Sequence, residues 1–511
     1  MITRKRWCLL LVLALMLMAP AASAESASEP VQGGTLVVGV DQEAIGLDPN
    51  IVTAFSSRRR VELMYNRLVR YDASAAIVPD LARAWEIPDP TTYIFHLHEG
   101  VTFHNGREVT AEDVKYTIER ILAPETGSPV RSFLLPIEEI VVRDRYTIEL
   151  RLTAPTASML DALSFSNVAI VPREVIEEHG DLQRVAVGTG PFQLERWVAD
   201  QETVFVRNPD YFEDDLPYLD RLVFRVIPDQ MSLLAGLRTG SLQAAQIDDA
   251  AVLSLAERDP DLEVLSTPAI LLRVFSFNVA REPFDDHRVR QAMALAMDRD
   301  EIIRVAEFGR GLVSAPIPSS AEAWAAPIDT LPNYTPDLER ARQLLEEAGV
   351  PQGARFDIVT SPTYEGGLAV AEIIQEQLRR IGLDPRLEVV EWGIYIDKWV
   401  NRDFDSMIEL RSGGGDPDTF LHRLIHSQGA VNNFQYANAE LDALLDTGRH
   451  LVAFDERHPI YLEAQHILAQ EVPYVALYAP VQTMVVQRGV HGFQVKPNAS
   501  FRLMDRMWME P

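Results

Sequence analysis

A glycine-rich loop at residues 411–418 carries the most distinctive charged groups of this 511-residue chain. It reads Arg411-Ser412-Gly413-Gly414-Gly415-Asp416-Pro417-Asp418. A guanidinium beside glycine backbone suits a carboxylate or a phosphate, because arginine offers two parallel N–H donors. The alternative interpretation is structural, namely a flexible connector in which Asp416 or Asp418 caps the next helix.

Two histidines four residues apart, His422 and His426, would lie on one face of a helix, as a pair of metal ligands can. The neighbouring sequence specifies no third ligand, so we expect neither a bound metal nor a cofactor. His96, His98 and His104 lie among strand-like residues, and we expect them to have structural roles.

Catalytic signatures are missing from the sequence. No G-x-S-x-G, H-E-x-x-H, G-x-x-x-x-G-K or G-x-G-x-x-G motif occurs. The single cysteine, Cys8, lies in the amino-terminal leader, so the remaining chain has no thiol nucleophile, disulfide or cysteine metal site. We therefore expect no enzyme, and a secreted hydrolase is the alternative.

The elements around the loop form a repeating pattern. Hydrophobic periodicity predicts strand 356–360, helix 367–381, strand 387–390, helix 394–401 and strand 404–410. This alternation is typical of a βαβαβ unit with a mainly parallel sheet. Ligands of such sheets bind beyond the carboxyl ends of the strands, which is where the loop at 411–418 begins.

Other segments are identified by their ends. An apolar strand is expected over Leu36–Val40, and apolar positions at helical spacing predict a helix from about 58 to 68. Further helices are expected to begin at Thr110, at Asp298 and at Thr335, where capping or helix-opening residues precede an apolar stripe. The three arginines at 58–60 are interpreted as a solvated helix start, and a grip on a ligand is the alternative.

Composition indicates a globular protein of roughly three domains, at about 150 residues per domain. Apolar residues make up 47% of the chain, and 75 acidic residues against 47 Lys and Arg give a net charge of −28. A chain this acidic repels a phosphate backbone and shows no segregated basic patch, so we expect no nucleic-acid partner.

The amino terminus resembles an export signal. Arg4, Lys5 and Arg6 precede an apolar run from Trp7 to Met18, and Ala22-Ser23-Ala24 supplies a cleavage site, which predicts a signal peptide at 1–24. Glu25 occupies the position where a lipoprotein would have its cysteine, so we expect no lipid anchor. We therefore expect a periplasmic protein that is secreted via its signal peptide.

Motifs in order along the chain resemble one known family. The chain is similar to the peptide/nickel/opine class of extracellular solute-binding proteins of ABC importers, family 5, which includes dipeptide- and oligopeptide-binding proteins. The resemblance rests on residues 81–86, 93–106 and 110–114, on Gly188-Thr189-Gly190-Pro191-Phe192, on Asn208-Pro209-Asp210-Tyr211, on 277–278 and 283–292, and on Asp416-Pro417-Asp418 and Tyr436-Ala437-Asn438.

The resemblance implies an α/β, two-lobed periplasmic-binding-protein clamp with two interlobe crossings and an extra subdomain inserted in the first lobe. On this sequence the first lobe would comprise 25–58, 185–275 and 477–511, the inserted subdomain 59–184 and the second lobe 276–476. The crossings would be Leu271–Val279 and Tyr474–Tyr478. Such a clamp closes by changing a few backbone dihedrals at a hinge.

The family's cleft also implies candidate ligand contacts, because a ligand removed from water needs polar partners and aromatic walls. The candidates are Glu43, Phe55, Trp392, Tyr395, Arg411, Ser412, Gly413, Asp416, Asp418 and Asn432, with Asn433 beside the last. Peptide-binding members read W-x-x-D-x-x-[DE]-P at this loop, where the first Asp pairs with the peptide ammonium. Here Gly413 falls in that position and Leu410 replaces the Trp.

The implied function is to capture a small solute and deliver it to a membrane permease with its ATPase, as a monomer. A short peptide is one candidate ligand, although the missing Asp removes the expected ammonium anchor. The same clamp binding an opine, a sugar, an organic anion or a metal chelate is the alternative.

Overall fold

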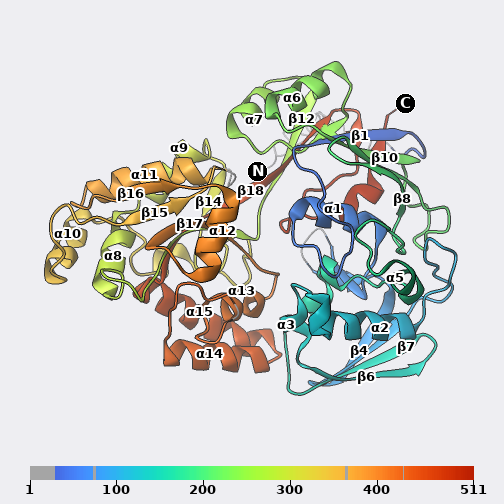
Figure 1. The fold of residues 1–511 in the computed structure, drawn as a ribbon, viewed down its shortest axis with the longest axis horizontal. Coiled ribbons are helices and arrows are strands. Elements are labelled where there is room, and N and C mark those ends of the chain that lie inside the picture. Colours follow the sequence, from blue (N-terminus) through green and yellow to red (C-terminus); the bar gives the residue numbers. More distant parts are fainter. Residues whose placement is uncertain (1–28, 73–75, 363–365, 430, 511) are drawn as a thin grey trace, which may run out of the picture.

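The computed structural model describes residues 29–72, 76–362, 366–429 and 431–510. It is a mixed α/β protein with two lobes, which lie on the left and right of Figure 1. The predicted signal peptide at 1–24 lies outside the described residues. Within the described ranges, no helix is long and apolar enough to cross a membrane.

The first lobe contains a sheet with the strand order β11-β1-β10-β9-β8, in which β1 (Thr35–Val40) pairs in parallel with β10 (Arg221–Val226). Alternate residues of β1, Leu36 and Val38, are fully buried, which is the pattern that predicted this strand. The other elements of this lobe are α1 (Phe55–Met64), β8 (Phe192–Val198), β9 (Glu202–Arg207), α6 (Gln230–Thr239), β11 (Ala244–Ala245), α7 (Ala250–Ala256) and β12 (Leu262–Pro268).

A separate four-stranded antiparallel sheet, ordered β4-β5-β7-β6, has its own apolar core with α2 (Ala111–Leu122) packed on it. As expected, α2 follows Thr110, whose N–H donates to the Asp113 carboxylate 2.9 Å away. This region also holds β2 (Val69–Tyr71), β3 (Ile77–Pro79), β4 (Ala82–Asp89), β5 (Thr92–Leu97), α3 (Arg131–Leu134), β6 (Ile137–Asp144), β7 (Thr147–Leu152), α4 (Met159–Leu163) and α5 (Arg173–His179).

The second lobe contains the βαβαβ unit that the sequence predicts. Its elements are β15 (Asp357–Thr360), α11 (Gly367–Arg379), β16 (Arg386–Val389), α12 (Trp392–Asn401) and β17 (Ser406–Ser412). β15 lies between β16 and β17 and is parallel to both, so the predicted parallel unit is confirmed. The wider sheet is mixed, because β17 is antiparallel to β13 (Leu271–Phe277).

Helices cover this sheet and complete the lobe. Asp298 caps α9, as expected, by accepting from the N–H of Glu301 at 2.8 Å. The helix expected at Thr335 begins instead after Asp337, whose carboxylate accepts from Arg340 N–H. The remaining elements are α8 (His287–Ala296), α9 (Arg299–Ala306), β14 (Gly311–Val313), α10 (Leu338–Glu347), α13 (Pro417–Ile425), α14 (Ala439–His450) and α15 (Phe454–Glu471).

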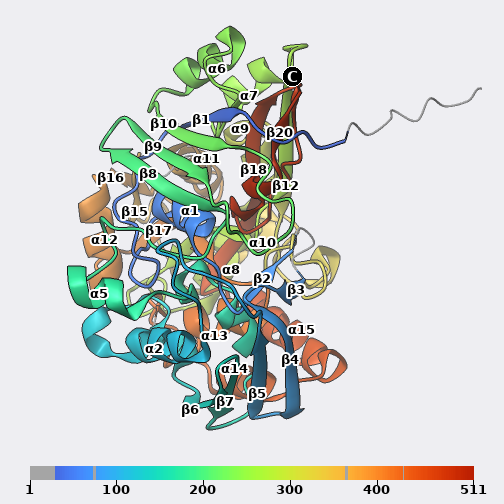
Figure 2. The ribbon, with the colours of Figure 1, turned by 90° about the vertical axis from the view of Figure 1, so that its right-hand side faces the viewer.

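One long strand, β18 (Tyr474–Gln487), belongs to both lobes. Its first half pairs with β13, and its second half pairs with β12 and β11. Figure 2 shows β18 running beside β12. The chain then ends with β19 (Val490–His491), the short helix Arg502–Arg506 and β20 (Trp508–Met509), and Phe493 and Phe501 return to the first lobe's core.

Candidate functional site

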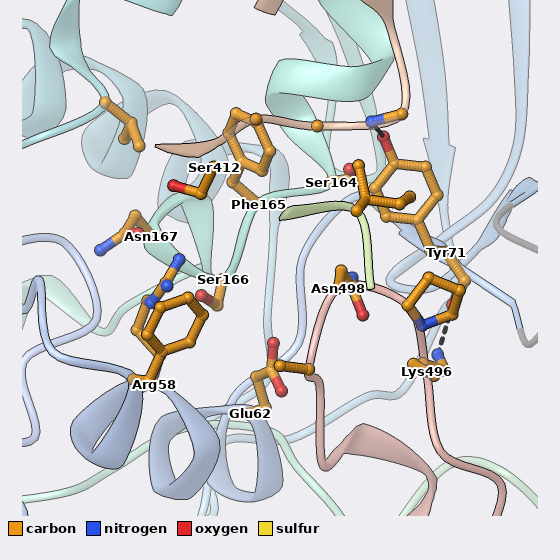
Figure 3. A pocket seen from close by; sticks show the side chains of 18 of the residues that line it. Arg58, Glu62, Tyr71, Ser164, Phe165, Ser166, Asn167, Ser412, Lys496 and Asn498 are labelled. Carbon is orange, nitrogen blue, oxygen red and sulfur yellow. Dashed lines mark hydrogen bonds between the residues drawn. The ribbon is translucent and has the colours of Figure 1, made fainter. Parts of the chain in front are cut away.

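A cavity of about 290 Å³ lies between the two lobes, and both lobes supply its walls. Figure 3 shows Arg58, Ser166 and Asn167 on one side of it and Tyr71, Lys496 and Asn498 on the other. The lining segments are residues 52–62 around α1, 67–72 around β2, 129–133 around α3, 164–167, 270–271, 412–415, Arg423 of α13 and 496–499.

Helix α1 presents one face to this cavity and buries the other. Phe55, Arg58 and Glu62 are three and four residues apart, so their side chains lie on the same face and line the cavity. Val61 and Met64, on other faces of α1, are fully buried in the first lobe's core. The helix ends at Met64, earlier than the sequence predicts, because Tyr65 adopts an extended conformation.

The loop after β17 forms the wall from the second lobe, at the carboxyl end of the strand as expected. Glycine is needed at two positions of this loop, because neighbouring atoms leave no room there for a Cβ atom. A Cβ on Gly413 would lie 2.5 Å from the Phe420 ring, and one on Gly414 would lie 2.1 Å from the Asp161 carboxylate. The N–H of Gly415 donates to the Asp161 carboxylate and to the Tyr71 hydroxyl, both 3.1 Å away.

Of the ligand-contact candidates from the sequence, the structure brings Phe55, Ser412 and Gly413 together on the cavity wall. Their contact with a ligand stays a prediction. The other seven candidates lie elsewhere, and their polar atoms already have partners within the protein or their rings pack away from the cavity.

Asp416 is the N-cap of α13 and does not line the cavity. One carboxylate oxygen accepts from Asp418 N–H at 2.9 Å. Both oxygens pair with the guanidinium of Arg457, at 2.7 Å each, and the Arg457 side chain is only 4% exposed. The capping interpretation of this loop is therefore the one that the geometry of Asp416 favours.

Asp418 joins the two lobes directly. Its carboxylate accepts from the Arg449 guanidinium at 2.9 Å within the second lobe and from the Ser158 hydroxyl at 2.9 Å across the interface. Nearby, the backbone N–H of Ala157 donates to the carbonyl of Arg449. Asp418 thus links the two lobes by a hydrogen bond, beside the cavity and outside its wall.

Arg411 is buried inside the second lobe. Its guanidinium pairs with Glu409 at 2.7 Å, donates to the Asn433 amide oxygen at 2.6 Å, and lies over the Phe434 ring. Asn432 is also internal, because its amide donates to the carbonyl of Tyr436 at 2.7 Å and shapes the loop after α13.

The aromatic candidates of α12 pack on each other away from the cavity. Trp392 stacks on Tyr395 with ring centroids 5.3 Å apart, and the buried Tyr395 hydroxyl donates to the carbonyl of Ile408. In the first lobe, the Glu43 carboxylate accepts from Trp197 Nε1 at 3.1 Å and from Asp200 N–H at 2.9 Å.

The arginine run at 58–60 was expected to be solvated, and the structure corrects this. Arg60 is 2% exposed and donates to the carbonyl of Ser56, while Arg59 donates to the carbonyl of Ala499. Arg58 lines the cavity beside Phe55. The run of three arginines in an acidic chain was the feature of the sequence that could have indicated Arg58 as a cavity residue. No feature of the sequence indicated Arg423.

His422, His426 and Asp446 form the one group among the described residues that has metal-ligand geometry. Nε2 of each histidine lies near the same Asp446 oxygen, at 3.3 and 3.4 Å. However, His426 Nδ1 accepts from Gln428 N–H, so the neutral ring carries its proton on Nε2 and has no lone pair there for a metal. Nε2 of His422 hydrogen-bonds to Asp446, whereas Nε2 of His426 is buried without a hydrogen-bond partner among the described residues.

Lys496 is the lysine of the cavity wall. Its ammonium donates to the carbonyl of Tyr71 at 2.7 Å, and the residue is 2% exposed. Burial lowers the pKa of this ammonium to about 7, although the Glu62 carboxylate acts in the opposite direction. Glu62 itself accepts from the Ser500 hydroxyl and from Phe501 N–H.

The Asp416–Arg457 pair predicts a stability effect. Asp416→Ala leaves the buried Arg457 charge without its partner, and we expect the free energy of unfolding to fall by about 3–5 kcal/mol. Asp337→Ala is the matched control, because Asp337 caps α10 in an exposed position and should cost about 1 kcal/mol. Urea unfolding measures both, and equal losses would contradict the importance of the ion pair.

Lys496 predicts a pH dependence. Because its pKa is lower in the folded protein than its usual 10.5, the unfolded chain binds more protons above pH 7, and stability rises with pH. Between pH 7 and 10 the wild type should gain up to about 1.4 kcal/mol per pH unit relative to Lys496→Met. Urea unfolding of both proteins over this range tests the slope, and parallel curves would contradict it.

Comparisons with known proteins agree with this architecture. The chain is 29% identical over 509 residues to heme-binding protein A of Haemophilus influenzae, covering 93% of this chain and 92% of that protein. The structure matches a periplasmic binding protein of Helicobacter pylori, solved with the peptide STSA, at a TM-score of 0.83 and 27% identity over 94% of this chain and 99% of that one.

A third match is AgaA from A. tumefaciens R10 in complex with agropinic acid, at a TM-score of 0.82 and 28% identity over 94% of this chain and 99% of that one. The model of the bacterial extracellular solute-binding proteins, family 5, matches residues 76–432. The fold is accordingly the two-lobed periplasmic-binding-protein fold that the motifs implied. The chain belongs to the bacterial extracellular solute-binding proteins, family 5.

Proposed function

We propose that this protein is the solute-binding component of an ABC importer, which captures one small molecule between its lobes and delivers it to a membrane permease. The observation that carries the proposal is the cavity of about 290 Å³, whose walls come from both lobes. A ligand there contacts both lobes at once, so it favours the closed form over the open one.

The proposed division of the chain is the one that the motifs imply, with residues 25–58, 185–275 and 477–511 as the first lobe, 59–184 as the inserted subdomain and 276–476 as the second lobe. The core packing supports shifting these bounds, because α1, which continues past residue 58, packs in the first lobe's core, whereas β13 and the part of β18 up to Tyr478 pack in the second lobe's core. The lobes move about two backbone segments, Ala269–Ile270 between β12 and β13, and the part of β18 between Tyr478 and Val481, where its pairing partners change. A few dihedral changes at these two segments are sufficient for closure.

The protein is proposed to act in the periplasm as a monomer, after removal of a signal peptide and without a lipid anchor. Its ligand is a short peptide or a related small organic solute, which leaves the cavity chemically unchanged. The peptide STSA bound to the Helicobacter relative and the agropinic acid bound to AgaA are ligands of the same kind of clamp.

A ligand screen tests the function. The protein is unfolded and refolded to remove any resident solute, and a compound that binds should stabilise it by about 2.7 kcal/mol at a concentration a hundred times its Kd. Thermal shift measures the gain, and small-angle scattering should show a smaller radius of gyration on binding. Recovery of a chemically altered compound would overturn the proposal.

The interlobe hydrogen bond of Ser158 predicts a second effect. Ser158→Ala removes the donor that the Asp418 carboxylate uses only in the closed form. Ligand affinity should fall about tenfold, because a hydrogen bond to a charged group contributes about 1.5 kcal/mol. Calorimetry with the ligand found by the screen measures the change.

The matched control is Ser241→Ala, because the Ser241 hydroxyl donates to the Gly236 carbonyl within the first lobe. Its affinity should equal that of the wild type, and unfolding of ligand-free Ser158→Ala should also be unchanged. An unaltered affinity in Ser158→Ala would show that this contact plays no part in closure.

A further inference from the structure

The cavity wall has a charge opposite to that of the chain. Among the described residues that line it, five are basic and two are acidic, whereas the whole chain carries −28; with its pKa at about 7, Lys496 carries only part of a positive charge at neutral pH. The cations are Arg58, Arg59, Arg67, Arg423 and Lys496, and the acids are Glu62 and Asp72. An excess of cations in a concave, partly desolvated site attracts an anion.

Three of these cations already have partners. Arg67 lies 3.8 Å from both Glu62 and Asp80. Arg59 donates to the Ala499 carbonyl, and Lys496 donates to the Tyr71 carbonyl. These three groups contribute to the positive electrostatic potential of the cavity, but most of their hydrogen bonds are made to other protein groups.

Arg58 and Arg423 differ from them. Within the part of the chain that the structure describes, no carboxylate lies within ion-pair distance of either guanidinium, and Nε of both is buried without a hydrogen-bond partner. The Arg58 side chain makes no hydrogen bond there, and that of Arg423 makes one, to the Ser412 carbonyl at 2.9 Å. Both retain unused N–H donors.

The two arginines come from opposite lobes. Arg58 lies on α1, which packs in the first lobe's core, and Arg423 lies on α13, which packs in the second lobe's core. Burial, together with the positive charges of Arg411 and Arg58, lowers the pKa of Arg423 to about 10. The positive charge of Arg58 therefore acts on Arg423, while the Glu62 carboxylate, one helical turn from Arg58 on α1, offsets part of the charge of Arg58.

Aromatic rings hold both guanidiniums in place. Arg58 lies 4.2 Å from the centroid of Phe55, and Arg423 lies 5.7 Å from that of Phe133. Phe165 also lines the cavity and adds apolar surface. The site thus offers two oriented forks of N–H donors next to an apolar wall.

The acids of the wall are occupied. Glu62 accepts from the Ser500 hydroxyl and from Phe501 N–H, and Asp72 accepts from Ala76 N–H at 3.0 Å. A ligand ammonium would have to compete with these contacts and with the five cations of the wall.

We propose that the ligand is a small organic anion whose carboxylate or phosphate group bridges Arg58 and Arg423 and whose apolar part packs against Phe133 and Phe165. This inference rests on the proposed function, since it identifies the ligand class of the same cavity. The anion supplies the negative charge that the two lobes lack when they meet, and its fork-shaped contacts to arginine fix its orientation.

The experiment combines native mass spectrometry of the protein purified from its periplasm with thermal shift and calorimetry on the refolded, ligand-free protein. The probes are N-acetyl-Ala-Phe as a carboxylate, phenyl phosphate as a phosphate, Ala-Phe amide as a cation and N-acetyl-Ala-Phe amide as a neutral compound. We expect the co-purified molecule to be an anion and only the anionic probes to bind. Whichever of these probes has the higher affinity shows whether the site prefers a carboxylate or a phosphate.

The anionic probe that binds with the highest affinity is then used to measure binding by variants of the two arginines. Arg58→Met and Arg423→Met should each weaken binding on the order of 10- to 100-fold, and Arg423→Lys should lose less because it keeps the charge. Ligand-free stability should not fall in Arg58→Met, since the change removes one of two mutually repelling charges. Arg342→Met, on the exposed face of α10, is the control and should bind normally.

The outcomes separate the two proposals. A co-purified molecule without an oxyanion, preferred binding of the neutral or cationic probe, or normal affinity in both methionine variants would overturn the anion assignment and leave the proposed function intact. If no molecule co-purifies and no probe of any charge binds, the proposed function itself fails, and this inference fails with it.

Discussion

The structure depends on one shared strand. β18 pairs with β13 in one half and with β12 and β11 in the other, so the sheets of both lobes are hydrogen-bonded to the same backbone. Each lobe packs its own apolar core against its own half of this strand. The two lobes thus share one strand while each keeps its own apolar core, which is the arrangement that the proposed hinge motion needs.

Charged groups around the cavity are divided by function. Asp416 with Arg457, and Arg411 with Glu409, stabilise the second lobe internally. Asp418 accepts a hydrogen bond from Ser158 of the facing lobe. Arg58 and Arg423, which line the cavity, have no carboxylate within ion-pair distance among the described residues and are the groups of the proposed anion site. Because buried charges are costly unless paired, this division explains why so many charges near the site lie outside its wall.

The sequence was sufficient for much of the fold and for little of the site. The βαβαβ unit could be predicted because each element has a regular apolar spacing, and the position of Ser412 and Gly413 followed from the rule that loops after parallel strands face ligands. The ion pair of Asp416 with Arg457 could not be predicted, because the two residues are 41 positions apart in the sequence. Arg58, Arg423 and Lys496 come from distant segments, and only the tertiary structure brings them to one wall.

The like charges of Arg58 and Arg423 have a consequence for the unloaded protein. If the lobes close without the proposed anion, the two guanidiniums would share a poorly solvated space, and the repulsion between them would favour opening. The ligand-free protein would therefore adopt the closed conformation less often than the ligand-bound protein. A permease that recognises only the closed conformation would then rarely bind the ligand-free protein. Its ATP hydrolysis would be coupled more tightly to transport of the ligand.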